Sequence, residues 1–186
     1  MKKSIDDLAQ DEDVAGLLRT RDYFHSLIRD EKAKGIASER IVVGGFSQGG
    51  SIAILSGFTC PTKLGGIFSL SGYLSLRHKM KDLIPNDNPN KDTKIFMGHG
   101  ENDFMVQYEL GVQTAEKLKE WGYIVDFHGY PYVPTPNCSA VGFNHALTCI
   151  SCSELDHSAS PQEMNDFEDF LTEVLPPVGG GQHSEL

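Results

Sequence analysis

The chain has 186 residues, of which 39% are hydrophobic and 23% are charged, and its formal net charge is −10 at pH 7. These values are typical of one soluble globular domain with a sizeable core. The acidic balance argues against a nucleic-acid-binding protein, which needs clustered Lys and Arg for phosphate contacts. The chain also lacks the run of about 18 apolar residues that stable membrane insertion requires.

The start of the chain and the cysteines indicate a compartment. Residues 1–7 include lysines but no apolar stretch, so they do not resemble a secretory signal. The four cysteines do not have the spacing of a disulfide framework: Cys60, Cys138, Cys149 and Cys152. We therefore expect a cytoplasmic protein.

The first half of the chain alternates helix and strand patterns. Apolar residues recur at helical spacing from Asp11 to Lys34, and Gly35 follows where a glycine commonly ends a helix. Residues 41–43 are β-branched and predict a fully buried strand. The small and apolar residues 48–58 predict a helix, and residues 64–70 predict a second buried strand.

The second half continues the alternation. Residues 86–92 have the composition of a loop, and strands are expected at residues 94–97 and 123–127. A helix is expected between them, at residues 110–119. This alternation predicts an α/β fold with a mostly parallel sheet and helices on both faces.

The last helix has the clearest start signal. Ser160 is expected at the N-cap, Pro161 at the first helical position and Glu163 at the capping-box position. The helix should run to Leu175 and dock through an apolar face formed by Met164, Phe167, Leu171 and Val174. Residues 178–186 are expected to be a disordered tail.

Residues 45–49 read Gly-Phe-Ser-Gln-Gly, a G-x-S-x-G pattern that directly follows one predicted strand and opens a helix. That setting forces the serine into a strained turn that projects its hydroxyl group, so Ser47 is the candidate nucleophile. Side chains at Gly45 and Gly49 would collide where strand and helix pack closely. The amide of Gln48 would donate to an oxyanion. The alternative is a glycine-rich turn without chemistry.

A serine nucleophile needs a base, and the base needs an orienting acid. In this class of fold the three follow the chain order serine, acid, histidine. Asp103 lies just past the third predicted strand, where active sites collect in open α/β sheets, and Glu101 is its competitor. His157 combines the right order with a loop after the last strand. His128 is its nearest rival and is expected at a strand end, whereas His99 is expected to shape the turn after the third strand.

Three segments together resemble the acyl-protein thioesterase family, most closely its fungal members. They are Gly44–Gly50, then Met97–Gly100 with Asp103 and Val106, and then Asp156-His157-Ser158. The resemblance implies an α/β-hydrolase fold and a triad of Ser47, Asp103 and His157, with no metal or organic cofactor.

By the same resemblance, the function would be hydrolysis of acyl thioesters or esters, above all removal of palmitoyl groups from protein cysteines. The substrates would be S-acylated proteins or lysophospholipids, and a nuclear location is expected beside the cytoplasmic one. Leu74 and Leu76 would border the acyl-chain channel, or would be ordinary apolar residues that anchor a loop. The oligomeric state stays open.

The chain departs from the family at its start. Family members begin with further strands and a loop that supplies a second oxyanion donor. We expect residues 1–177 to form one truncated α/β-hydrolase domain in which the strand at residues 41–43 is an exposed edge. Loss of one oxyanion donor costs about 10²–10³ in turnover, so the alternative function is an inactive fragment or pseudoenzyme that only binds partners.

A second departure is an insert at residues 132–153, which lacks helical or strand periodicity. It could be a surface loop or lid. It could also be a zinc site formed by Cys138, His145, Cys149 and Cys152, although only one C-x-x-C pair is present. The third interpretation is a retained intron, because its removal would restore the short loop of the family. The insert is expected to be poorly ordered.

Overall fold

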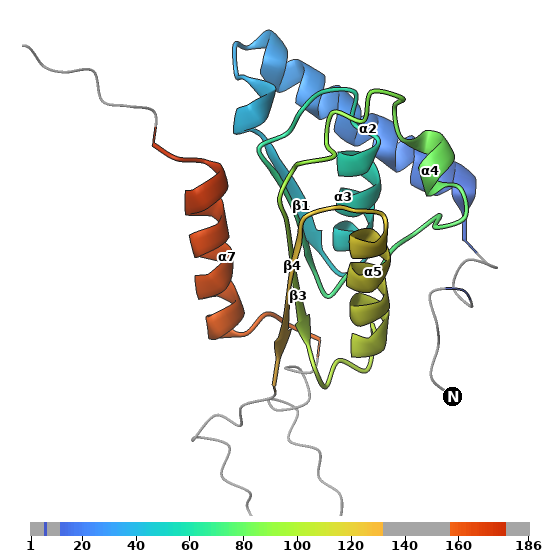
Figure 1. The fold of residues 1–186 in the computed structure, drawn as a ribbon, viewed down its shortest axis with the longest axis vertical. Helices are drawn as coiled ribbons and strands as arrows, with labels where there is room; N and C mark the ends of the chain where they lie inside the picture. Colours follow the sequence, from blue (N-terminus) through green and yellow to red (C-terminus); the bar gives the residue numbers. More distant parts are fainter. Residues whose placement is uncertain (1–5, 7–11, 132–156, 178–186) are drawn as a thin grey trace, which may run out of the picture.

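The computed structural model describes residue 6, residues 12–131 and residues 157–177, and its sheet has four parallel strands (Figure 1). The strands are β1 (Val42–Phe46), β2 (Gly66–Leu70), β3 (Ile95–Gly100) and β4 (Val125–Tyr130), in the order β1-β2-β3-β4. Since all four run in the same direction, their carboxyl ends lie along one edge of the sheet.

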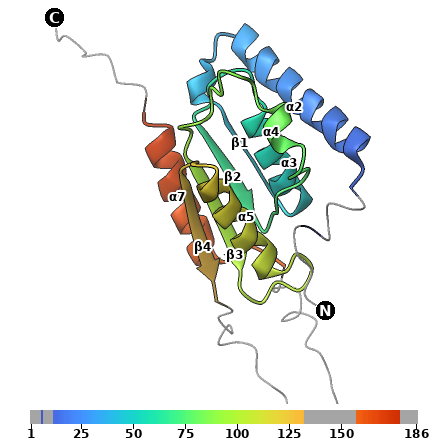
Figure 2. The ribbon, with the colours of Figure 1, turned by 45° about the vertical axis from the view of Figure 1, so that its right-hand side comes forward.

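Helices cover both faces of this sheet, as the sequence predicted. The longer helices on one face are α2 (Val14–Ala33), α3 (Gln48–Phe58) and α5 (Tyr108–Glu120), and α7 (Pro161–Val174) lies on the other (Figures 1 and 2). Two short elements that the sequence did not predict are η1 (Ser38–Arg40) and α4 (Met80–Leu83). The predicted α/β-hydrolase type of fold is confirmed.

Two apolar layers hold the helices on the sheet. The layer under α2, α3 and α5 includes fully buried residues such as Ile54, Phe58 and Ile67. Within it, the rings of Phe58 and Tyr123 stack with their centroids 4.3 Å apart. Burial of each large side chain of this kind stabilises the fold by about 1.5–3 kcal/mol. These contacts fix the positions of the strand ends.

The layer under α7 differs from the predicted one. Phe96, Leu70 and Phe170 are buried together, and Phe167, Leu171 and Val174 pack against them. Met164, which was predicted to face the sheet, is 44% exposed, whereas Phe170 is only 7% exposed. Three of the four predicted positions therefore pack on the sheet, and the buried ring of Phe170 takes the place that was expected of Met164.

Several predicted boundaries are confirmed. Gly35 has φ 95°, the left-handed conformation that ends a helix without a side-chain clash. The capping box of Ser160 and Glu163 is present at the start of α7. Strand β3 extends beyond the predicted end to Gly100, because its last residues pair with residues 128–130 of β4.

Strand β1 pairs only with β2 among the residues that the structure describes. This arrangement agrees with the expectation that the strand before Ser47 is an edge. In the same part of the chain, no helix is long and apolar enough to span a membrane.

Some predictions fall on residues that the structure does not describe. The insert at residues 132–153, with its loop, zinc and intron interpretations, lies outside the described residues, as does the tail at residues 178–186. The division of the chain into one truncated domain and a tail stays a prediction.

Candidate active site

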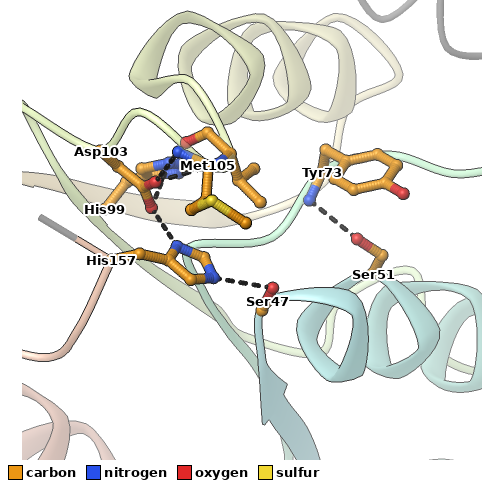
Figure 3. Close-up of polar contacts among 8 residues, drawn as sticks. Ser47, Ser51, Tyr73, His99, Asp103, Met105 and His157 are labelled. Atoms are coloured by element: carbon orange, nitrogen blue, oxygen red, sulfur yellow. Dashed lines mark hydrogen bonds and ion pairs between the residues drawn. The ribbon is translucent and has the colours of Figure 1, made fainter. Parts of the chain in front are cut away.

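Ser47 lies on the turn between β1 and α3, where it is the N-cap residue of the helix. Its backbone has φ 57° and ψ −126°, a conformation that is strained for a residue with a side chain. The Ser47 N–H donates to the carbonyl oxygen of Leu70 at the end of β2, at 2.8 Å. The turn is therefore held by the neighbouring strand, and the hydroxyl group points out of the sheet edge (Figure 3).

The glycines of this turn have different roles. A Cβ atom at Gly45 would come within 2.5 Å of the carbonyl carbon of Gly49, so strand and helix touch at Gly45 as predicted. A Cβ atom at Gly49 would meet nothing within 4 Å, and the prediction of a collision at that position is wrong. Gly49 matters instead because its backbone is what Gly45 approaches. The sequence analysis did not single out Gly50, but a Cβ atom there would lie 2.6 Å from the Ser69 hydroxyl oxygen.

Gln48 is the first residue of α3, so its N–H is one of the amides that a helix start leaves without an intrahelical acceptor. The helix dipole adds partial positive charge at this end. An oxyanion that forms on a group attached to Ser47 would therefore meet a donor here. The Gln48 amide has the position that the sequence predicted, and its role in binding an oxyanion stays a prediction.

His157 joins Ser47 and Asp103 in one chain of hydrogen bonds (Figure 3). The distance from His157 Nε2 to Ser47 Oγ is 2.9 Å, and the distance from Nδ1 to Asp103 Oδ2 is 2.6 Å. Because a carboxylate accepts, Nδ1 carries the proton and Nε2 is free to accept from the serine hydroxyl group. His157 lies 54 residues after Asp103 and 110 residues after Ser47 in the sequence, and the parallel sheet brings the three residues together.

Asp103 is buried, and its carboxylate is fully satisfied. Oδ1 accepts the N–H groups of Met105 and Val106, each at 2.9 Å, and Oδ2 accepts from His157. A buried charge is tolerated only with such partners. The turn that supplies the two N–H groups also prevents the aspartate from rotating away from the imidazole.

Glu101, the competitor of Asp103, and His128, the rival of His157, lie away from Ser47. Glu101 is exposed, and its carboxylate lies beside Gly129, 3.2 Å from where a Cβ atom of that glycine would be. His128 lies within β4, where it pairs with Asp126 at 2.9 Å and stacks on Phe96. Neither residue contacts Ser47 in the described structure.

His99 supports the acid, and the sequence analysis had related it only to the turn after β3. Its Nε2 lies 2.7 Å from the carbonyl oxygen of Val106, so Nε2 carries the proton and closes the loop around Asp103. Burial lowers the pKa of His99, and the ring is therefore neutral near pH 7. A Cβ atom at Gly111 would lie 2.3 Å from His99 Nδ1, so only glycine leaves room for this ring. The spacing His-x-x-x-Asp was the available signal.

The apolar side chains of Phe46 and Met105 lie beside the hydrogen-bonded chain. The ring of Phe46 lies 4.7 Å from the imidazole of His157, centroid to centroid. Phe104 and Met105, on the loop after Asp103, are exposed large apolar residues. Figure 3 shows the side chain of Met105 on the side of the site where Ser47 and His157 meet. A group bound to Ser47 would therefore meet an apolar surface.

Leu74 and Leu76 do not belong to this surface. Both are buried and pack in the core between the sheet and its helices. Leu76 has φ 52°, and its N–H donates to the carboxylate of Glu12 at 3.0 Å, so it helps fix the loop after β2. The structure shows both as core residues, and their role beside an acyl chain stays a prediction.

Within residues 12–131 and 157–177, no group of three His, Cys, Asp or Glu side chains could hold a metal ion. Cys60, the described cysteine, is buried and free.

Comparison with known proteins agrees with the fold and assigns the chain to a family. A parallel sheet with a serine on a strained turn between strand and helix, and a histidine and an aspartate from later loops, defines the class of α/β-hydrolases. A family model described as phospholipase/carboxylesterase matches residues 3–153. The chain belongs to the phospholipase/carboxylesterase family.

Two curated relatives carry the same name. Acyl-protein thioesterase 1 of Neurospora crassa is 43% identical over 185 residues, which cover 98% of this chain and 66% of the relative. Acyl-protein thioesterase 1 of Aspergillus fumigatus is 42% identical over 93% of this chain and 63% of the relative. The predicted resemblance to fungal acyl-protein thioesterases is confirmed, and the chain spans less than two thirds of the length of these two relatives.

Solved structures show the same fold. Arabidopsis thaliana SOBER1 superposes with a TM-score of 0.70 at 28% identity, over 88% of this chain and 66% of that one. Zea mays acyl-protein thioesterase 2 superposes with a TM-score of 0.63 at 22% identity, over 83% and 64% of the two chains. At that lower identity the likeness supports the fold alone.

Proposed function

We propose that the chain is a serine hydrolase of acyl thioesters and esters, and that its main substrates are S-acylated cysteines of proteins. The observation that carries the proposal is the continuous chain of hydrogen bonds from Ser47 through His157 to Asp103. The names of the curated relatives and the exposed apolar side chains of Phe46 and Met105 at the site support an acyl chain as the bound group. Lysophospholipids are the second substrate class.

The proposed reaction follows from the protonation of the three side chains. His157 Nε2 accepts the proton of Ser47 as Oγ attacks the acyl carbonyl carbon, and Asp103 stabilises the imidazolium. The Gln48 amide would donate to the oxyanion. The bond from the carbonyl carbon to sulfur then breaks, and the leaving thiol takes the proton from His157. Water, activated by the same imidazole, releases the fatty acid and restores the serine.

The test is hydrolysis of an S-palmitoylated peptide, followed by chromatography of the free thiol peptide. The parent chain should release the thiol, and Ser47→Ala should reduce the rate by about 10⁴-fold or more, since removal of a triad nucleophile has effects of this size. An oxygen-ester analogue of the peptide tests preference for thioesters. Equal rates for the parent and Ser47→Ala would contradict the proposal and favour the alternative, an inactive fragment that only binds partners.

A further inference from the structure

The position of His157 depends on the start of α7. Only three residues separate His157 from Pro161, the first residue of the helix. The imidazole has to stay within hydrogen-bond distance of both Ser47 and Asp103, at 2.9 and 2.6 Å. With so short a connection, any movement of the first turn of α7 moves the ring. What holds that turn therefore holds His157.

The first turn is held by a reciprocal pair of hydrogen bonds. The Ser160 hydroxyl oxygen accepts the N–H of Glu163 at 3.0 Å, and Glu163 Oε2 accepts the N–H of Ser160 at 3.2 Å. Capping boxes commonly lie at the surface, where either partner can be replaced at small cost. Here the glutamate is only 1% exposed, so this capping box lies inside the protein.

The same glutamate contacts strand β3. A Cβ atom at Gly98 would lie 2.3 Å from Glu163 Oε1 and 3.0 Å from its Cδ atom, so the carboxyl group lies directly over the backbone of this glycine. Gly98 is five residues before Asp103 in the chain. The side chain of Glu163 thus connects the helix that follows His157 to the strand that leads to Asp103.

Burial of the Glu163 carboxyl group costs free energy. Oε1 is buried and has no hydrogen-bond partner among the described residues. An unpaired buried oxygen costs free energy, and a methylene or methyl group would fill the same space without that cost. Stability alone does not explain a carboxyl group at this position, whereas a requirement for the Ser160 contact next to His157 does.

We propose that Glu163 is a positioning residue for His157: its buried carboxyl group fixes the first turn of α7 on β3 and so keeps the imidazole between Ser47 and Asp103. The consequence for hydrolysis rests on the proposed function, but the consequence for the geometry of His157 does not. Glu163 acts through Ser160 and the backbone, and it does not contact the reacting atoms.

The charged groups around Glu163 fit this role. Asp103 at the site and Asp166 on α7 face it, and the Tyr130 hydroxyl group on β4 donates to Asp166 at 2.8 Å. Burial, together with the carboxylates of Asp103 and Asp166, raises the pKa of Glu163 to about 7. A proton on Glu163 avoids a second full charge beside the buried Asp103.

The test uses proton NMR of the full chain, in which the Nδ1 proton of His157, in its short hydrogen bond to Asp103, gives a far-downfield resonance. Its absence in His157→Ala assigns the signal. Glu163→Ala should broaden or remove this resonance and should slow labelling by a fluorophosphonate about 10- to 100-fold, because small displacements of reacting groups have effects of this size. Glu163→Gln retains an acceptor for the Ser160 N–H and should keep both the resonance and the labelling rate of the parent. Glu168→Ala, at an exposed position of the same helix, is the matched control.

The outcomes separate the two proposals. A His157 resonance that is unchanged in Glu163→Ala, or absent from the parent chain, overturns the positioning role. If circular dichroism shows that Glu163→Ala does not fold, Ser160→Ala decides instead: it removes half of the capping box, and an unchanged resonance there overturns the role. A parent chain that does not hydrolyse thioesters but loses the resonance in Glu163→Ala contradicts only the proposed function.

Discussion

Ser47 combines a strained backbone with a tightly held position. A residue with a side chain at positive φ costs about 1–3 kcal/mol, and such residues persist only where neighbouring contacts determine them. The hydrogen bond to Leu70 and the contact of Gly45 with Gly49 supply those constraints. The strain presents the hydroxyl group to His157, so the local sequence and the geometry of the candidate site are linked at this one residue.

Glu163 predicts a specific pH dependence of stability. Its pKa is raised by burial from its ordinary value of 4.5 to about 7, so the folded chain binds this proton more tightly than the unfolded chain does. This contribution to stability is fully present below pH 4.5 and is lost as the pH rises through 7. Relative to Glu163→Gln, the parent should lose about 2–3 kcal/mol of unfolding free energy between pH 4.5 and pH 8.

Urea denaturation of both chains at several pH values measures this difference, and Glu168→Gln is the control for an exposed carboxylate on the same helix. A difference between the parent and Glu163→Gln that stays constant from pH 4.5 to pH 8 would contradict the buried, proton-binding state of Glu163.

At the scale of residues, the sequence predicted those parts of the site that follow from order and local pattern. Ser47 was predicted by its turn, and Asp103 and His157 by their places after strands. His99 and Glu163 were recognised only as a turn residue and a cap. Their burial depends on glycines at distant positions that make room for them, and a pattern along the chain does not show which glycine faces which side chain.

At the scale of elements, α7 packs against β3 and β4 on the face of the sheet opposite to α3 and α5 (Figure 2). The rings of Phe167 and Phe170 on this helix pack on Phe96. Near the end of the helix, Glu173 pairs with Nζ of Lys94, the residue just before β3. The other end of the helix begins three residues after His157. The packing of α7 therefore determines both local stability and the position of His157.

Phe170 and Met164 give a matched pair of substitutions on this helix. Phe170→Ala removes a buried ring and should lower the free energy of unfolding by about 3–5 kcal/mol. Met164→Ala, at a position that is 44% exposed, should change it by less than about 0.5 kcal/mol. Urea denaturation followed by circular dichroism measures both. A larger loss of unfolding free energy in Met164→Ala than in Phe170→Ala would contradict this packing and favour the face that the sequence predicted for α7.

Strand and helix identity was predictable because the apolar periods and glycine signals were strong. The extent of β3 was not, since residues 98–100 include two glycines and a histidine, which have weak strand preference. Pairing with β4 determines their conformation. The missed helix α4 is short and depends on the buried Met80 rather than on a repeating pattern.

At the scale of the whole molecule, β1 is one of the two edge strands of the described sheet, and its residues Val42 and Val43 are apolar. Unpaired strand edges with apolar residues favour association with other chains. We expect the purified chain to self-associate as its concentration rises from about 1 to 100 μM, a range in which such surfaces aggregate. Sedimentation velocity measures this. One monomeric species at every concentration would contradict it.

In the function that we propose, Ser47 is activated by His157 and Asp103 and is the nucleophile of a hydrolase. The most direct measurement is intact mass after incubation with a fluorophosphonate, which forms a covalent bond with an activated serine. We predict one adduct on the parent and on Glu168→Gln, no adduct on Ser47→Ala, and labelling of His157→Ala slowed by at least about 10³-fold. An adduct on Ser47→Ala, or a parent chain that gains no mass, would contradict the claim.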